Sequence, residues 1–336
     1  MSDVSEGRGW RSTASVIRLA VGLAILALLF VLLPRERIWT AIRSIPLSLW
    51  LIVVAGYLAG HSLGMMKYRM MVNLGGAELS YPQAAQCYFG GLFGTLFLPS
   101  IVGGDVVRVG VGLRMARHRA GFLLGSLIDR LMDVLALALT AAAGAVLLPE
   151  QLSPHSRRIF LLAMGAITIA IVGTAAVFAA LPARRFSFHF RRNFARLRQA
   201  GRSMRCRPHV VLVSLAGGVA VQSSFVLLTA VLARVCGLHL RLPAWFLAWP
   251  LAKLAALLPI SQAGLGVREA ALAALIVPFG APPALTVAVG LVWQTVIYAG
   301  GLLSGLLGLL ARRYSNGGQA QTGAADAGQS RSAGRL

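Results

Sequence analysis

The sequence predicts an all-α, polytopic integral membrane protein, and three observations support this prediction. Hydrophobic residues make up 57% of the 336 residues and charged residues only 12%, whereas about 25% charged residues is usual for a soluble domain. Several apolar runs reach about 20 residues, the length of a helix that crosses a hydrocarbon core of about 30 Å. The residue-by-residue alternation that is typical of a transmembrane β-barrel is absent from the sequence.

Six apolar runs are long enough to cross the membrane completely. The first follows several arginines, as in a signal peptide, but it is long for such a segment and no small-residue cleavage site follows it. We therefore expect it to remain as a span. The six expected spans are 14–33, 48–66, 120–148, 158–181, 209–233 and 284–311.

Two further apolar regions, 84–113 and 244–280, are interrupted by glycine and proline. Proline removes a backbone donor and glycine weakens a helix, so neither region should form one straight span. We expect two re-entrant segments of broken helix, in which the chain turns at hinge positions. The expected hinges are Pro99, Gly103 and Gly104 in the first region, and Pro259, Gly264 and Gly266 in the second.

The arginines between the apolar runs predict the orientation. Nine of them lie in segment 182–208, and more lie in 108–119 and 312–313. Cytoplasmic loops carry an excess of Lys and Arg, so we expect these segments and both chain termini in the cytoplasm. Each broken region must then return to the side from which it entered, and the arginines of 35–43 remain outside.

The net charge of +22 indicates anionic lipid headgroups as neighbours rather than nucleic acid, because no nucleic-acid-binding motif accompanies it.

This topology predicts an inverted repeat of two halves, about 14–148 and 158–311. Each half reads as two spans, a broken region and a third span, and three crossings invert the second half relative to the first. In segments 98–108 and 258–268, a Leu-Pro pair is followed by glycine five residues after the proline and arginine nine residues after it. Inverted repeats with broken helices are typical of alternating-access transporters. The alternative is a chance resemblance between segments rich in leucine, glycine and alanine.

Each broken region carries an acid beside an arginine. Asp105 and Arg108 are three residues apart, and Arg268 and Glu269 are adjacent. Charge inside a membrane is costly and indicates a functional site. Because arginine can bind phosphate through two parallel hydrogen bonds, we expect these residues to bind a lipid headgroup. The alternative is that each carboxylate only neutralises its own arginine.

The expected span 120–148 carries Asp129, Arg130 and Asp133. Asp129 and Asp133 are four residues apart and share one face of a helix. These residues either line a substrate path or stabilise the bundle through ion pairs. Asp133 has no partner visible in the sequence and is the better candidate for proton exchange. Lys253 either adds a cation to the same site or extends its flexible side chain to the membrane interface.

No motif of a hydrolase, a phosphate-binding loop or a zinc protease is present. The cysteines Cys87, Cys206 and Cys236 are widely spaced and form no metal-ligand pattern. We therefore expect no catalytic residues, no metal and no cofactor. His61 and Gln222 are lone polar residues on spans, and we expect neighbouring helices to satisfy them.

The two ends of the chain lack long apolar runs. We expect 1–13 to be a cytoplasmic N-terminal segment. Residues 312–336 are rich in glycine, alanine, serine and glutamine, so we expect a disordered cytoplasmic tail.

The motifs at 98–108 and 258–269, with the acids of 129–133, resemble the transmembrane domain of the lysylphosphatidylglycerol synthases. That family includes stand-alone flippase-like proteins, and the resemblance covers about residues 15–311. In the two-part synthases this domain moves aminoacylated phosphatidylglycerol between leaflets, and a separate cytoplasmic domain makes that lipid. The aminoacyl-transferase domain is not expected in this chain, so we expect no enzymatic activity. The resemblance implies a location in the bacterial inner membrane and a site at Asp105, Arg108, Arg130, Arg268 and Glu269.

We interpret the sequence as an inner-membrane lipid translocase that moves or binds a phospholipid or related polar lipid through a polar cavity at mid-membrane. The expected partners are membrane lipids, and a separate lipid-modifying enzyme is a further candidate. The sequence leaves the oligomeric state open. Two alternatives remain: a non-transporting accessory subunit of an envelope-lipid or polyprenyl-glycosyl pathway, and an ion-coupled carrier of a small solute.

Overall fold

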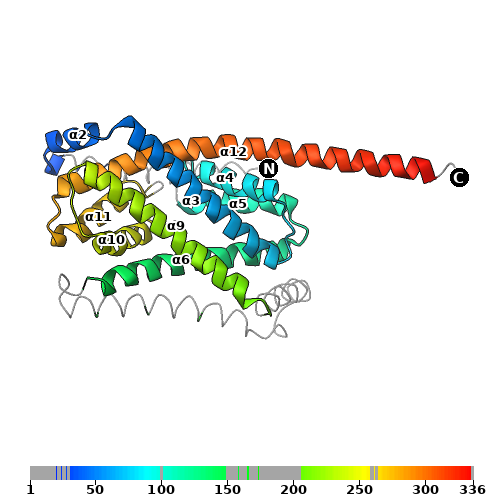
Figure 1. The fold of residues 1–336 in the computed structure, drawn as a ribbon, viewed down its shortest axis with the longest axis horizontal. Helices are drawn as coiled ribbons and strands as arrows, with labels where there is room; N and C mark the ends of the chain where they lie inside the picture. The colour runs from blue at the N-terminus through cyan, green and yellow to red at the C-terminus, as the bar shows by residue number, and fades with distance from the viewer. Residues whose placement is uncertain are drawn as a thin grey trace, which may run out of the picture.

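The computed structural model describes residues 31–98, 101–148, 206–257, 261 and 264–333, with a few isolated positions outside these ranges. The expected spans 14–33 and 158–181, the segments 1–13 and 182–208, and the hinges Pro99 and Pro259 lie largely or wholly outside them. Every regular element within the described ranges is helical (Figure 1). The helices are α2 (Arg35–Arg43), α3 (Leu47–Leu74), α4 (Tyr81–Gly94), α5 (Ile101–Met115), α6 (Arg119–Val146), α9 (Pro208–Val235), α10 (Leu242–Ala255), α11 (Val267–Ile276), the short 3₁₀ helix η3 (Val277–Phe279) and α12 (Pro283–Ala333).

Three of the described helices are long and apolar enough to cross a membrane: Leu47–Leu74, Pro208–Val235 and Pro283–Ser315. They correspond to three of the six expected spans and extend each of them. Helices α3 and α9 have 28 residues each, about 42 Å at a rise of 1.5 Å per residue. Helix α6 also has 28 residues and differs in carrying Asp129, Arg130 and Asp133 within its apolar sequence.

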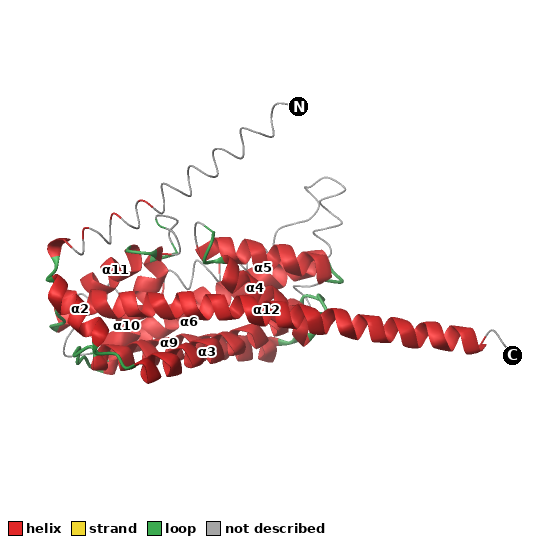
Figure 2. Cartoon of the chain, turned by 90° about the horizontal axis from the view of Figure 1, so that it is seen from above, coloured by secondary structure: helices red, strands yellow, loops and turns green. Residues whose placement is uncertain are grey.

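Both interrupted regions fold as pairs of short helices rather than as single spans, as the sequence predicts. Helices α4 and α10 have 14 residues each, about 21 Å, which is too short to cross a core of about 30 Å. Helix α4 packs against α5, and α10 packs against α11. Figure 2 shows the α4–α5 pair and the α10–α11 pair at opposite ends of the bundle.

The hinge prediction is wrong for Gly103 and Gly104, which lie inside α5. A side chain at Gly104 would come within 2.6 Å of the carbonyl oxygen of Gly91 on α4. Gly104 therefore allows close contact between two helices rather than a turn, and Gly103 allows close contact with Leu98, in the segment after α4. Gly264 and Gly266 do lie in the turn before α11, and both have φ of +77°, a conformation that side chains disfavour.

The described long helices run in two opposite directions. In Figure 1, α6 and α9 begin at the end of the bundle that holds α4 and α5, whereas α3 and the apolar part of α12 end there. In the packing, α12 contacts α4, α6 contacts α10, and α3 contacts α9. The last expected span of each expected half, α6 or α12, therefore packs against a short helix from the other.

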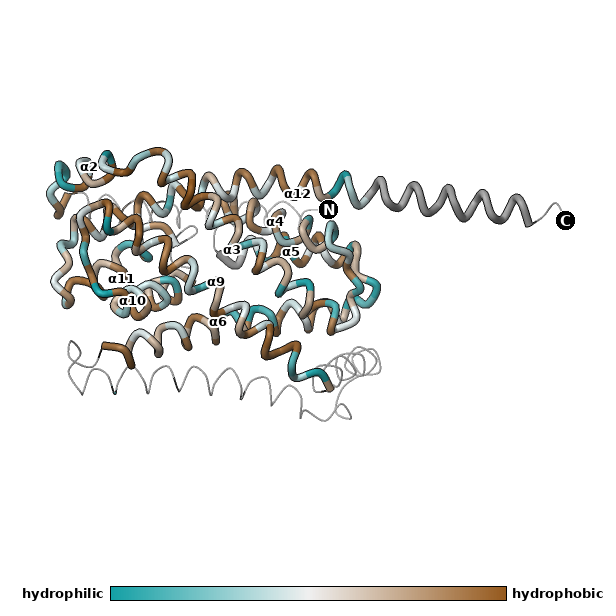
Figure 3. Tube along the Cα trace, viewed as in Figure 1, coloured by the Kyte–Doolittle hydropathy of each residue, from teal (hydrophilic) through white to brown (hydrophobic). Residues whose placement is uncertain are grey.

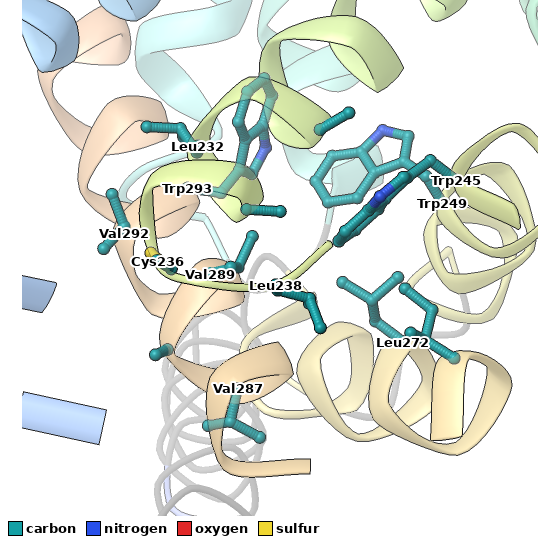
Figure 4. Close-up of a cluster of buried hydrophobic side chains, with 14 of the residues drawn as sticks. Leu232, Cys236, Leu238, Trp245, Trp249, Leu272, Val287, Val289, Val292 and Trp293 are labelled. Carbon is teal, nitrogen blue, oxygen red and sulfur yellow. The ribbon is translucent and has the colours of Figure 1, made fainter. Parts of the chain in front are cut away.

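The apolar side chains form two main cores, one for each pair of short helices. The larger core joins α9, α10, α11 and α12 and contains the indole rings of Trp245, Trp249 and Trp293 (Figure 4). The smaller core joins α3, α4 and the start of α6 around Tyr68 and Phe122. The colouring in Figure 3 shows hydrophobic residues along the outer helices, and α12 exposes several leucines, as expected of a surface that faces lipid.

The C-terminal segment differs from its prediction. Residues 312–336 were expected to be disordered, but α12 continues as far as Ala333 and projects beyond the bundle in Figure 1. The apolar part of α12 provides a preformed helix, and each further residue then adds one backbone hydrogen bond without a new nucleation cost.

Candidate functional site

A buried lysine joins α3 to α6. Lys67 Nζ donates hydrogen bonds to Asp129 Oδ1 at 2.7 Å and to Asp133 Oδ1 at 2.6 Å. The side chains of Lys67 and Asp129 are only 5% and 1% exposed, whereas that of Asp133 is 23% exposed. One ammonium group is therefore shared by two carboxylates that lie one helical turn apart.

Helix α5 closes the charges of α3 and α6 into a ring. Arg108 Nη2 lies 2.9 Å from Asp105 Oδ1 and 3.9 Å from Asp129 Oδ2. Arg130 binds the other oxygen of Asp105 and lies 3.8 Å from Asp133 Oδ2. We call the resulting closed sequence of alternating charges the charge ring; its members are Lys67, Asp129, Arg108, Asp105, Arg130 and Asp133.

The charge ring contains three cations and three carboxylates, so its formal charge is zero. An isolated charge is very costly in an apolar interior, and pairing offsets part of this cost. Aromatic rings also cover one of the cations, because the Arg108 guanidinium lies 4.4 Å from the ring centre of Tyr68 and 5.5 Å from that of Tyr88. The arrangement keeps six charges inside the bundle without a net charge.

The second pair of short helices holds a smaller polar site. Glu269 is fully buried; it accepts hydrogen bonds from the backbone N–H of Gly266 at 2.8 Å and from Arg268 Nε at 3.1 Å. Arg268 Nη2 also donates to Gln294 Oε1 of α12 at 2.8 Å. The adjacent charges of α11 are thereby tied to the start of their own helix and to α12.

Lys253 lies between the two sites. Its ammonium donates to Gln222 Oε1 of α9 at 2.9 Å and lies 5.1 Å from the ring centre of Phe225. Its charge interacts with those of the ring through Asp133 and Arg130, and with that of Arg268. Within the part of the chain that the structure describes, no carboxylate lies within ion-pairing distance of Lys253. Lys253 therefore points to the bundle interior rather than to the membrane interface.

Aromatic side chains connect the two sites across α3 and α9. His61 Nδ1 lies 3.2 Å from the Tyr88 hydroxyl, which confirms that a neighbouring helix satisfies His61, as Lys253 does for Gln222. Successive rings lie 5.0–6.0 Å apart, and Arg108 and Arg268 stand over the two ends of the series. The series runs through Tyr88, His61, Phe225, Trp293 and Trp249.

Several buried polar atoms beside these charges have no hydrogen-bond partner among the described residues. They are Arg108 Nε and Asp129 Oδ2 in the charge ring, Trp249 Nε1 and Gln294 Nε2 near Arg268, and Ser261 Oγ in the turn before α11. Buried polar groups normally find a partner, which can be a water molecule or a ligand. Both sites thus retain unused capacity for polar binding.

The structure brings the sequence-predicted residues into two groups. Asp105, Arg108, Asp129, Arg130 and Asp133 all belong to the charge ring, while Arg268 and Glu269 form the second site with Lys253 between the two. Sequence reasoning missed Lys67 and therefore left Asp133 without a partner. The signal was present, because Lys67 and Arg69 lie between two pairs of methionines, so the apolar sequence resumes beyond the two charges, but we ended the span at residue 66.

The fold and the site define a class: a polytopic helical membrane protein with charged residues packed against one another inside the bundle. Residues 15–305 match the family described as the lysylphosphatidylglycerol synthase TM region, and the chain belongs to this family. A search of curated proteins gives no match.

Proposed function

We propose that the protein binds a phospholipid or a related polar lipid and moves it between the leaflets of the bacterial inner membrane. Family membership supports a function related to membrane lipids. The observation that carries the proposal is the pair of buried arginines, Arg108 and Arg268, one from each pair of short helices, at the two ends of one series of aromatic rings. Such groups can offset the cost of taking a polar headgroup through the hydrocarbon core.

The proposal assigns different roles to the charges of the site. Arginine binds phosphate through its planar set of donors, so Arg108 and Arg268 are the groups for a headgroup phosphate. Asp105 and Glu269 hold these arginines in position and can pair with a cationic part of a headgroup. The chain moves lipid without making or breaking its bonds, and a separate enzyme of lipid modification is the expected partner.

We further propose that the two halves form an inverted repeat and that lipid movement accompanies rocking of one half against the other. The reciprocal packing of α12 on α4 and of α6 on α10 supports this repeat. The positions of the two pairs of short helices at opposite ends of the bundle support the inversion (Figure 2). The end that holds α4 and α5 also carries the basic residues at the starts of α6 and α9, so we place it in the cytoplasm together with both termini.

This orientation predicts which loops can be labelled from each side of the membrane. Glu78 and His239 are exposed residues in the loops before α4 and before α10. With the three native cysteines replaced by serine, Glu78→Cys should react with a membrane-impermeant maleimide only from the cytoplasm, and His239→Cys only from outside. Reaction of both positions from the same side of intact cells would contradict the inverted arrangement.

Lipid bound to the purified protein tests the proposed substrate class. Mass spectrometry of the full chain purified in mild detergent should show one phospholipid class enriched over its share in the membrane. Arg268→Gln should lose this enrichment, and the matched control Arg234→Gln, an exposed residue at the end of α9, should keep it. If the lipid that co-purifies with the wild type and with both variants has the composition of the bulk membrane, the result would argue against a headgroup site and favour an accessory subunit.

A further inference from the structure

The three groups Lys67, Asp129 and Asp133 form a unit that the proposed headgroup binding does not use. Their formal charges sum to −1, because one ammonium faces two carboxylates at 2.7 Å and 2.6 Å. Among the described residues Asp129 Oδ2 has no hydrogen-bond partner, and Asp133 Oδ2 lies 3.8 Å from Arg130 Nη1. The unit has therefore one negative charge that no group inside it neutralises.

The rest of the charge ring cannot exchange protons in the same way. Arginine stays protonated in proteins, whereas an ammonium or a carboxylate can gain or lose a proton. Arg108 and Arg130 are thus fixed charges, and Asp105 is held between them. Proton exchange within the ring is confined to the unit of Lys67 and its two carboxylates.

Access to the two carboxylates differs. The side chain of Asp133 is 23% exposed and that of Asp129 is 1% exposed. A proton can therefore enter at Asp133. Asp129 is the carboxylate that is more readily protonated, because burial disfavours its charged form.

The neighbouring elements complete the electrostatic environment of the unit. Helix α5 contributes Asp105 and Arg108, α6 contributes Arg130, and α10 contributes Lys253, whose charge interacts with Asp133. His61 of α3 and Tyr88 of α4 also lie within the range of the Asp133 charge. Helix α9 faces the aliphatic part of Lys67 with Gly217 and Gly218, which leave room for the side chain.

We propose that Lys67, Asp129 and Asp133 form a proton-exchange site that couples lipid movement to the proton gradient across the membrane. This inference rests on the proposed function and adds its energy source. A proton from one side enters at Asp133 and binds Asp129 Oδ2, where it forms a carboxylic acid O–H and removes one of the two charges that hold Lys67. The ammonium then pairs with Asp133 alone, α6 can move relative to α3, and loss of the proton to the other side restores the shared bond.

The first measurement is independent of transport. Infrared difference spectra of the full chain in membranes, recorded between about pH 9 and about pH 5, should show a carboxylic acid C=O band that grows as the pH falls. Asp129→Asn should remove this band. The matched control Glu78→Gln should keep it, because Glu78 lies in an exposed loop and pairs with the exposed Arg117.

The second measurement is the rate of lipid movement in proteoliposomes with and without an imposed pH gradient. The ratio of the two rates should be several-fold for the wild type and fall to one in Asp129→Asn, which keeps the size of the side chain but cannot bind a proton. A wild-type ratio of one together with no titrating band would overturn the proton site and leave the proposed function intact. A band that titrates and requires Asp129, in a protein that moves no lipid, would support the proton site and overturn the proposed function.

Discussion

Replacing Lys67 with alanine should lower the free energy of unfolding by about 3–5 kcal/mol, the usual cost of breaking a buried ion pair. The change removes the shared partner of Asp129 and Asp133, and the nearest remaining cations lie 3.9 Å and 3.8 Å away. Thermal unfolding of the purified protein in detergent measures the effect.

A second substitution should restore much of this loss. Lys67→Ala combined with Asp129→Asn keeps the charge of the three groups at −1 and leaves Asp133 near Arg130. Arg117→Ala serves as the control, because its pair with Glu78 is exposed and its removal should leave the unfolding temperature unchanged. If Lys67→Ala unfolds at the wild-type temperature, the charge ring does not stabilise the bundle.

Removal of Arg108 or Arg268 should slow lipid movement by about tenfold to about hundredfold, since hydrogen bonds to charged groups contribute about 1.5–3 kcal/mol each. Arg108→Ala leaves Asp105 paired with Arg130 and Asp129 paired with Lys67, so the protein should still fold. Arg268→Ala would leave the fully buried Glu269 carboxylate without its cation, with the Gly266 N–H as its remaining hydrogen-bond donor among the described residues. This change is therefore combined with Glu269→Gln, which removes the buried negative charge.

The readout is the rate of lipid movement per folded protein, with melting temperature measured in parallel. Arg234→Ala, at an exposed position on α9, is the control and should behave as the wild type. Loss of folded protein in both arginine variants, with a normal rate for the part that remains folded, would make the two arginines structural.

The long spans and the broken regions could be predicted because they depend on local properties of the sequence. A run of about 20 apolar residues requires a crossing helix, and Pro and Gly interrupt a helix wherever they are frequent. The glycines of α5 were misread because the sequence does not distinguish a glycine that turns the chain from one that lets another helix approach. That distinction depends on Gly91, which lies on a different helix.

The site could be predicted only as separate parts. The rarity of charge in apolar sequence identified Asp105, Arg108, Asp129, Arg130 and Asp133, but their closure into one ring depends on how α3, α5 and α6 pack. Lys67 was missed for the opposite reason. Two charges, Lys67 and Arg69, at the end of an apolar run look like a helix terminus, yet α3 continues beyond them to Leu74.

Lipid movement by the purified protein alone tests the central claim most directly. The full chain is reconstituted into liposomes that carry a fluorescent phospholipid in both leaflets, and an impermeant reductant is added outside, with and without an imposed pH gradient. The account predicts that the wild type brings inner-leaflet label to the outside faster than protein-free liposomes and faster than Arg108→Ala. The account would be contradicted if the reductant quenches only the label of the outer leaflet, with and without the pH gradient, although the wild-type protein is correctly folded.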